Sequence, residues 1–213
     1  MFKIDLHVHT TASDGELSSR EIIDLAIQKD IKVIAITDHN SISGIKEALK
    51  YSNEKDIEVI PGVEISCEFE DYPEVHIVGL FIDYNNKELE KFSKKEKFSI
   101  KQAIELIKNA KGIPILAHPG VYLNNSEKII KEFIENDGKG IEINYPYDKI
   151  YGLDKEKMEL RNLGFKKIVE EKGLIISGGS DFHGRKRKVE IGEQGINDEE
   201  FMKLTSKNNS FYF

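Results

Sequence analysis

Six histidines in this sequence stand in motifs that suit metal chemistry. His7 and His9 alternate in "DLHVH", His39 follows an acid in "ITDHN", and the others lie in "EVHIVG", "LAHPG" and "GSDFHG". Five of the six lie at or just past the end of a predicted strand, whereas His76 lies early in one. Four acids occupy the same kind of position, namely Asp14, Asp38, Glu64 and Asp181. This grouping favours ligands over scattered structural histidines.

Imidazole and carboxylate groups together predict a site for divalent transition metals. They suit zinc, manganese or iron, whereas calcium would be held by oxygen alone. With Asp38 set aside, nine candidate ligands exceed the capacity of one ion, so two or three metals would share the site, with Glu64 as a bridge. Metals packed this closely can hold a bridging hydroxide as nucleophile and clamp phosphoryl oxygens. The nine are His7, His9, Asp14, His39, Glu64, His76, His118, Asp181 and His183.

Short apolar runs alternate with longer amphipathic ones, which is typical of βα units and predicts a mostly parallel sheet, open or closed into a barrel. The first helix has a capping-box pattern at Ser18 and Glu21. In a strand, residues i and i+2 face the same side, so His7 and His9 can both face a barrel interior. The carboxyl ends of parallel strands meet at one rim, where ligands would gather. Predicted strands are 3–8, 31–37, 58–64, 75–81, 113–117, 140–144 and 174–177; predicted helices begin at 18 and span 43–52, 87–110, 126–135 and 155–172.

The composition predicts a soluble globular protein. Of 213 residues, 32% are charged and 39% hydrophobic, and the formal net charge is −7, which argues against nonspecific nucleic-acid binding. We expect a single domain over 1–213, with a short or reduced insertion around 84–110. No signal peptide or membrane span is predicted, and the lone Cys67 suits a reducing compartment, so we expect a cytoplasmic protein.

Other residues near the histidines could contact a substrate. The run "GRKRK" directly follows His183, and Arg185 is the predicted phosphate contact; a solvated charge run is the alternative. Tyr145, Tyr147 and Tyr151 could stack on a ring, although loop packing is the commoner role. A Ser/His/Asp triad within "SDFH" is not favoured, because residues so close in sequence rarely form one and no "GxSxG" elbow is present.

The order of these motifs resembles the polymerase and histidinol phosphatase (PHP) family. The resemblance runs through "DLHVHTTASDG", "AITDHNSISG", "VIPGVEIS", "VHIVGLFID", "ILAHPG" and "SGGSDFHG". It implies a distorted (β/α)7 barrel with a three-metal site at the carboxyl ends of the strands. Asp38 would be a partner of His39 rather than a ligand. The implied ligand sets are His7, His9, Glu64 and Asp181; Glu64, His76 and His118; and Asp14, His39 and His183.

The predicted function is that of a metal-dependent phosphoric ester hydrolase. Substrates would be phosphomonoesters or the ends of nucleotides and short oligonucleotides, with no obligate protein partner. Nucleotide-acting relatives carry a helical insertion after "GLFID" and an arginine after the His-Pro pair, and this chain has a short segment and "GVY" there instead. The alternatives are a histidinol-phosphate phosphatase, and a non-catalytic metal-binding accessory module.

Overall fold

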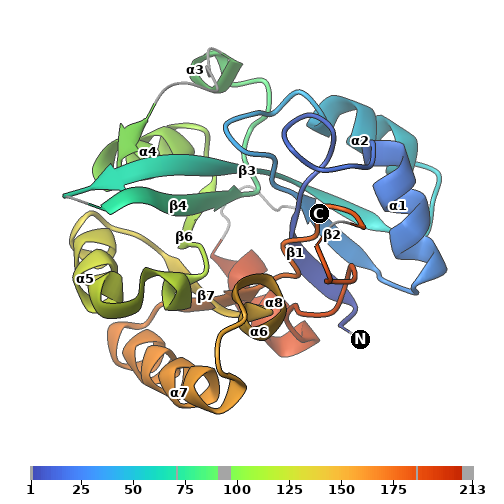
Figure 1. Cartoon of the computed structure of the whole chain (residues 1–213). Helices are drawn as coiled ribbons and strands as arrows, with labels where there is room; N and C mark the ends of the chain where they lie inside the picture. The colour runs from blue at the N-terminus through green and yellow to red at the C-terminus, as the bar shows by residue number, and fades with distance from the viewer. Residues whose placement is uncertain (1, 71, 91–96, 186, 208–213) are drawn as a thin grey trace.

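Seven strands of the computed structural model form one sheet in the order β1-β2-β3-β4-β6-β7-β8, and short β5 pairs with β3. A bridge between Val8 and Phe182 joins the first strand to the segment after the last, so the sheet is nearly closed (Figure 1). The predicted distorted α/β barrel is confirmed. The structure describes residues 2–70, 72–90, 97–185 and 187–207. The strands are β1 (Ile4–Val8), β2 (Val33–Ile36), β3 (Glu58–Phe69), β4 (Tyr72–Leu80), β5 (Phe98–Ser99), β6 (Ile113–Leu116), β7 (Gly140–Asn144) and β8 (Ile175–Gly178).

Helices surround the sheet, and their apolar faces pack on its outer side (Figure 1). The predicted capping box opens the first of them, since the Ser18 side chain accepts from the Glu21 amide and the Glu21 side chain accepts from Ser18. None of the described helices is both long and apolar enough to cross a membrane. The helices are α1 (Ser19–Gln28), α2 (Ile45–Ser52), α3 (Lys87–Glu90), α4 (Ile100–Asn109), the 3-10 helix η1 (Pro119–Asn125), α5 (Ser126–Glu135), α6 (Tyr147–Tyr151), α7 (Lys155–Lys172) and α8 (Asp198–Ser206).

The sheet is mixed because β4 runs antiparallel to both of its neighbours, β3 and β6. Strands β3 and β4 follow each other without a helix between them. The start of β4 therefore lies at the same rim as the ends of the parallel strands. This explains the position of His76, which stands early in its strand and pairs with Ser66 near the end of β3.

The predicted helix 87–110 is wrong as a single element. Helix α3 covers only Lys87–Glu90, residues 91–96 lie outside the described residues, and α4 begins at Ile100. The reason is local: Ser99 caps α4, accepting from the Gln102 amide while the Gln102 side chain accepts from Ser99. A capping box at this point starts a new helix and fixes the extended conformation of the residue before it.

Strand β1 changes its pairing just before the rim. Its register on β2 shifts between Asp5 and Val8, and an irregularity of this kind re-aims side chains. Before Val8, Ile4 and Leu6 belong to an inner apolar cluster with residues of β2, β6 and β8. Val8 itself packs with the outer cluster that includes the helices.

Cys67 lies in β3 with no exposed surface, and burial, followed by the charge of Glu64, raises the pKa of its thiol far above the usual range. Because thiolates rather than thiols react, we expect no measurable reaction of Cys67 with an aromatic disulfide reagent in the native protein. One equivalent should react in guanidinium chloride, and absorbance titration measures both. Prompt stoichiometric reaction of the folded protein would contradict this arrangement of β3.

Candidate metal centre

The Glu64 carboxylate lies at the middle of the rim and is 1% exposed. Five histidine rings surround it. Its Oε2 lies 3.1 to 3.2 Å from one nitrogen of each of three rings. Its Oε1 lies 3.1 and 3.2 Å from nitrogens of two others. The three rings belong to His7, His9 and His39, and the two to His76 and His118.

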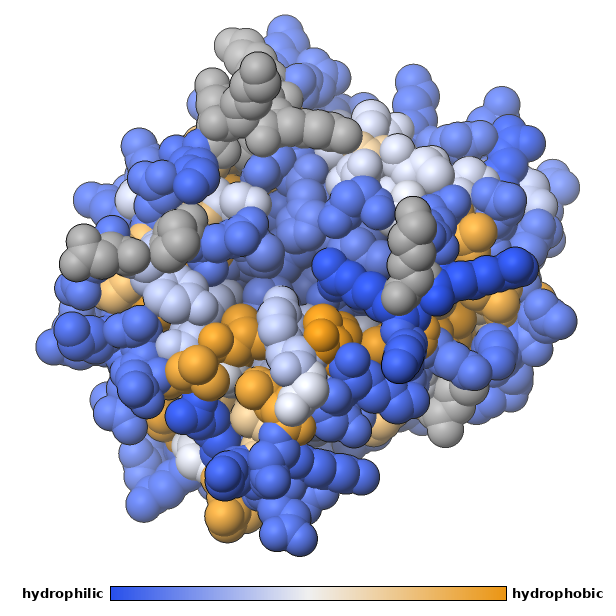
Figure 2. Space-filling model, viewed as in Figure 1, coloured by the Kyte–Doolittle hydropathy of each residue, from blue (hydrophilic) through white to orange (hydrophobic). Residues whose placement is uncertain are grey.

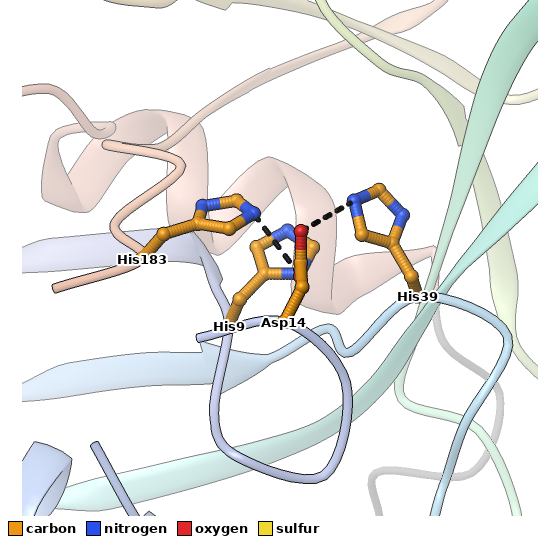
Figure 3. A group of neighbouring side chains, drawn as sticks. All are labelled: His9, Asp14, His39 and His183. Atoms are coloured by element: carbon orange, nitrogen blue, oxygen red, sulfur yellow. Dashed lines mark ion pairs between the residues drawn. The ribbon is translucent and has the colours of Figure 1, made fainter. Parts of the chain in front are cut away.

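Asp14 reaches the same cluster from the loop after β1. Its Oδ1 lies 3.3 Å from His183 Nε2 and 3.7 Å from His9 Nδ1, and its Oδ2 lies 4.0 Å from His39 Nε2. Figure 3 shows these four side chains pointing toward one another. Because the Asp14 side chain is 53% exposed while Glu64 is buried, the centre is open on the Asp14 side.

Asp181 completes the group from the segment after β8. Its Oδ1 lies 3.2 Å from His9 Nε2, 3.3 Å from His183 Nδ1 and 3.5 Å from His7 Nε2. Its Oδ2 accepts a 2.6 Å hydrogen bond from the Tyr145 hydroxyl. The structure thus brings all nine sequence-derived candidates together.

The donor set fits divalent metals in two respects. Ligand atoms of His7, His9, Glu64 and Asp181 all lie within 4.8 Å of one another, the same four residues that the family resemblance groups together. Among the described residues, five rings carry a buried nitrogen without a hydrogen-bond partner, an arrangement that native proteins usually avoid. Bound cations would satisfy such nitrogens. They are His9 Nδ1, His39 Nδ1, His76 Nε2, His118 Nδ1 and His183 Nε2.

The carboxylates of the centre are held in their ionised form. Burial alone would raise the pKa of Glu64, but the positive charges of His7 and His76 hold it well below the usual range. The pKa of Asp181 is also held well below its usual range, against the effect of burial, first by the charge of His7. Ionised carboxylates are the form that binds metals.

Three of the rings, those of His7, His9 and His76, carry protons that a metal would have to displace, and Glu64 and Glu142 hold the pKa of His7 well above its usual range. Burial alone would lower their pKa values, but Asp181 and Glu64 raise the pKa of His9 to about 9, and Glu64 contributes most to raising that of His76 to about 10. Burial instead lowers the pKa of His39 to about 3. Metal binding requires neutral imidazole, so loading this centre exchanges protons for cations.

Glu142 is a buried partner that sequence reasoning missed. Its Oε1 lies 3.0 Å from His7 Nδ1, and its Oε2 accepts a 2.9 Å hydrogen bond from the His118 backbone amide. It therefore orients one candidate ligand and fixes the backbone of another. The signal in the sequence was a lone acid between two isoleucines in "GIEIN" of β7.

Asp5 is a second buried carboxylate that was missed. Its oxygens accept hydrogen bonds from the Ser180 amide and hydroxyl, and from the amides of Gly192 and His7. Burial raises the pKa of Asp5 to about 6. The two Ser180 donors tie β1 to the segment that carries Asp181, and the Gly192 amide ties it to the chain further on.

Asp38 does not contact the ring of His39 as predicted. Its Oδ1 accepts from the Thr10 amide at 2.8 Å and the Ser13 hydroxyl at 2.6 Å, and its Oδ2 accepts from the Thr10 hydroxyl at 2.7 Å. The carboxylate is buried and holds the loop that carries Asp14. Its role is to position that loop.

We expect Asp38→Ala to lower the free energy of unfolding by about 3 kcal/mol, because buried donors of Thr10 would lose charged acceptors. Urea denaturation measures the change. Asp38→Asn, which keeps one acceptor oxygen, should lose less. An alanine variant as stable as the parent protein would show that these bonds do not hold the loop.

Of the two arginines in "GRKRK", Arg187 contacts the centre, whereas the contact of Arg185 with a substrate phosphate stays a prediction. Arg187 Nη1 donates to Asp181 Oδ2 at 2.8 Å, and its side chain is 34% exposed. The Arg185 side chain is exposed, and its backbone amide donates to Glu16.

Of the three tyrosines that could stack on a substrate ring, Tyr145 and Tyr147 are buried, whereas Tyr151 is 50% exposed.

The open side of the centre borders a small cavity of about 310 Å³. Asp14 and His39 line it, together with Ser66 and Glu74. On the face shown in Figure 2, hydrophilic residues surround a hollow near the middle, and apolar residues gather beside it. A small polar group could reach Asp14 and His39 from this side.

The fold and the centre define a barrel with candidate metal-binding clusters of histidines and carboxylates at its carboxyl rim. A match to the PHP domain family covers residues 5–146, and the chain belongs to this family. A structure described as a candidate metal-dependent phosphoesterase from Bifidobacterium adolescentis superposes with a TM-score of 0.81 over 97% of this chain and 96% of that one. At 20% identity this similarity shows the fold alone.

Two relatives of known description share part of the sequence. A 5′-3′ exoribonuclease of Haemophilus influenzae is 41% identical over 105 residues, which are 49% of this chain and 38% of the exoribonuclease. A 3′,5′-nucleoside bisphosphate phosphatase of Chromobacterium violaceum is 41% identical over 83 residues, which are 39% of this chain and 29% of the phosphatase. The chain thus matches less than two fifths of the length of either relative.

Proposed function

We propose that this protein hydrolyses phosphate esters with the help of two or three divalent ions held by the nine clustered residues. The observation that supports the proposal most is that five histidine rings surround Glu64. In addition, five of the six histidines, His183 among them, have a buried ring nitrogen without a hydrogen bond. A structural metal site is usually closed by four ligands. This centre has more than twice that number and an open side.

When bound, divalent ions would stabilise charge on phosphoryl oxygens and make a water molecule more nucleophilic. The side chains around the ions would bind the substrate and position the ligands. Asp14 and His39 meet an incoming phosphoryl group at the open side. Arg187 keeps guanidinium donors free beside Asp181 and can bind a phosphate oxygen, while Tyr145 fixes Asp181 by a hydrogen bond.

The substrates proposed are phosphomonoesters or the ends of short nucleic acids. The names of the two relatives support this class, because one acts on RNA from its 5′ end and the other on a nucleoside bisphosphate. The metals would be manganese, iron or zinc, which imidazole and carboxylate ligands suit. A free, buried cysteine agrees with a reducing compartment, and we propose the cytoplasm.

An activity panel on protein of measured metal content tests the proposal. It includes phosphomonoesters, a 3′,5′-bisphosphate and a short oligonucleotide, each with added Mn²⁺. We expect turnover of at least one class, and His9→Ala should abolish it while circular dichroism shows an intact fold. Absence of turnover with metals fully bound would favour a non-catalytic accessory module.

A further inference from the structure

A second cavity lies at the opposite, amino-terminal rim of the barrel. Its volume is about 700 Å³, within the range of small-molecule sites. The turns leading into β6, β7 and β8 form its walls. These strands are four or five residues long, so the cavity lies on the order of 15 Å from the metal centre. It is a separate site and not part of the centre.

The cavity is rich in positive charge although the whole chain carries a net charge of −7. Five lysines and a single acid, Asp137, line it. Lys108 and Lys139 both pair with Asp137. The other three, Lys111, Lys172 and Lys207, have no carboxylate partner among the described residues. Three ammonium groups are therefore free to meet an anion.

Part of the cavity lining, called here the apolar floor, consists of apolar side chains. They are Ile113, Pro114, Ile134, Leu174 and Ile175. Such a surface suits a ring or another apolar body rather than a bare inorganic ion. Apolar walls with a few placed polar groups are typical of small-molecule sites. The expected ligand thus combines an apolar, ring-bearing part with several negative charges.

Each lysine taken alone has a simpler explanation. Lys111 and Lys172 stand where α4 and α7 end, and Lys207 follows α8, so each is favoured by the negative end of a helix dipole. That explanation does not require the three to face one cavity. Three successive turns nevertheless read Lys-Gly at the start of a strand or within two residues of it: Lys111-Gly112, Lys139-Gly140 and Lys172-Gly173. Because of this repetition, lysines from three turns line one cavity beside the apolar floor.

We propose that the cavity at the amino-terminal rim binds a nucleoside di- or triphosphate, its phosphates on Lys111, Lys172 and Lys207 and its base on the apolar floor. Binding there requires no metal ion and none of the nine residues of the centre. The site is thus a ligand-binding site separate from phosphoester hydrolysis.

Calorimetric titration of ADP into the full chain in EDTA tests the proposal. We expect one ADP bound per chain, and Lys111→Glu with Lys172→Glu should weaken it at least 10-fold. The matched control is Lys155→Glu with Lys157→Glu, which makes the same charge change at exposed positions at the other end of α7. Circular dichroism checks that both double variants fold. The control and His9→Ala should bind ADP as the parent does.

Four results would overturn the proposal. They are no binding at millimolar ADP, equal affinity in the Lys111/Lys172 variant and the parent, loss of binding in His9→Ala, and binding of inorganic tripolyphosphate as tight as that of ADP. The third would place the nucleotide at the metal centre. The fourth would show that the apolar floor contributes nothing. None of these results bears on whether the protein hydrolyses phosphate esters.

Discussion

Glu64→Gln is expected to lower phosphoester turnover by about 100-fold or more, which exceeds the loss typical of residues that only support ligands. The side chain reaches two sets of rings, since Oε1 faces His76 and His118 while Oε2 faces His7, His9 and His39. Glutamine has the same shape but replaces one oxygen with a donor. It therefore cannot bridge two cations.

Metal analysis distinguishes this effect from simple unfolding. We expect the Glu64→Gln protein to retain fewer ions per chain than the parent, measured by mass spectrometry of the purified protein. Glu58→Gln is the matched control, because Glu58 lies on the same strand β3 and is exposed, and it should keep both turnover and metal content. A glutamine variant with full metal content and full turnover would rule out a bridging role for Glu64.

Metal loading is expected to raise the melting temperature by roughly 8 to 16 °C. Free metal at about 1,000 times its dissociation constant stabilises the native state by about 4 kcal/mol. For a chain of this length each kcal/mol corresponds to about 2 to 4 °C. The physical reason is that buried ring nitrogens without partners gain them only in the folded, metal-bound protein. Scanning calorimetry in EDTA and in excess Mn²⁺ measures the difference.

The control for this effect is the same pair of scans on Glu64→Gln, which should show a clearly smaller rise. Zn²⁺ and Fe²⁺ are tested in parallel because the ligand set suits all three metals. If none of them changes the melting temperature of the parent protein, the cluster does not bind metal under these conditions, and the proposed function loses its basis.

The nine clustered residues could be predicted from the sequence because each stands in a short local motif. Their convergence at one rim follows from the barrel, which the family resemblance implied, whereas the alternation of strands and helices left the sheet open or closed. His76 was recognised from its neighbours, but its position early in a strand had no explanation without the direction of β4. Strand direction depends on pairing with β3 and β6, which no local pattern in the sequence specifies.

The supporting residues were harder to predict, because their partners are far away in sequence. Glu142 meets His7 across 135 positions. Asp38 precedes His39 directly, yet its carboxylate faces the loop of Thr10. Arg185 stood nearer the motif, but the chain turns after Gly184, which has a φ of 112° that favours glycine, and Arg187 reaches Asp181 instead. For Asp38 and Arg187 the path of a loop decides the contact, whereas Glu142 and His7 meet because strands β7 and β1 lie in one barrel.

Among the described residues, the first and last strands of the barrel share no ladder of paired residues. This seam between them has the isolated Val8–Phe182 bridge and a hydrogen bond from the His9 amide to the Phe182 carbonyl. The other neighbouring strands of the barrel are joined by ladders of paired residues. Candidate ligands lie on both sides of the seam: His7 and His9 on the side of β1, and Asp181 on the side of β8. Bound ions would therefore act as a cross-link between the two ends of the sheet. The lifetime of the folded barrel against proteases would then follow the rate at which the ions dissociate.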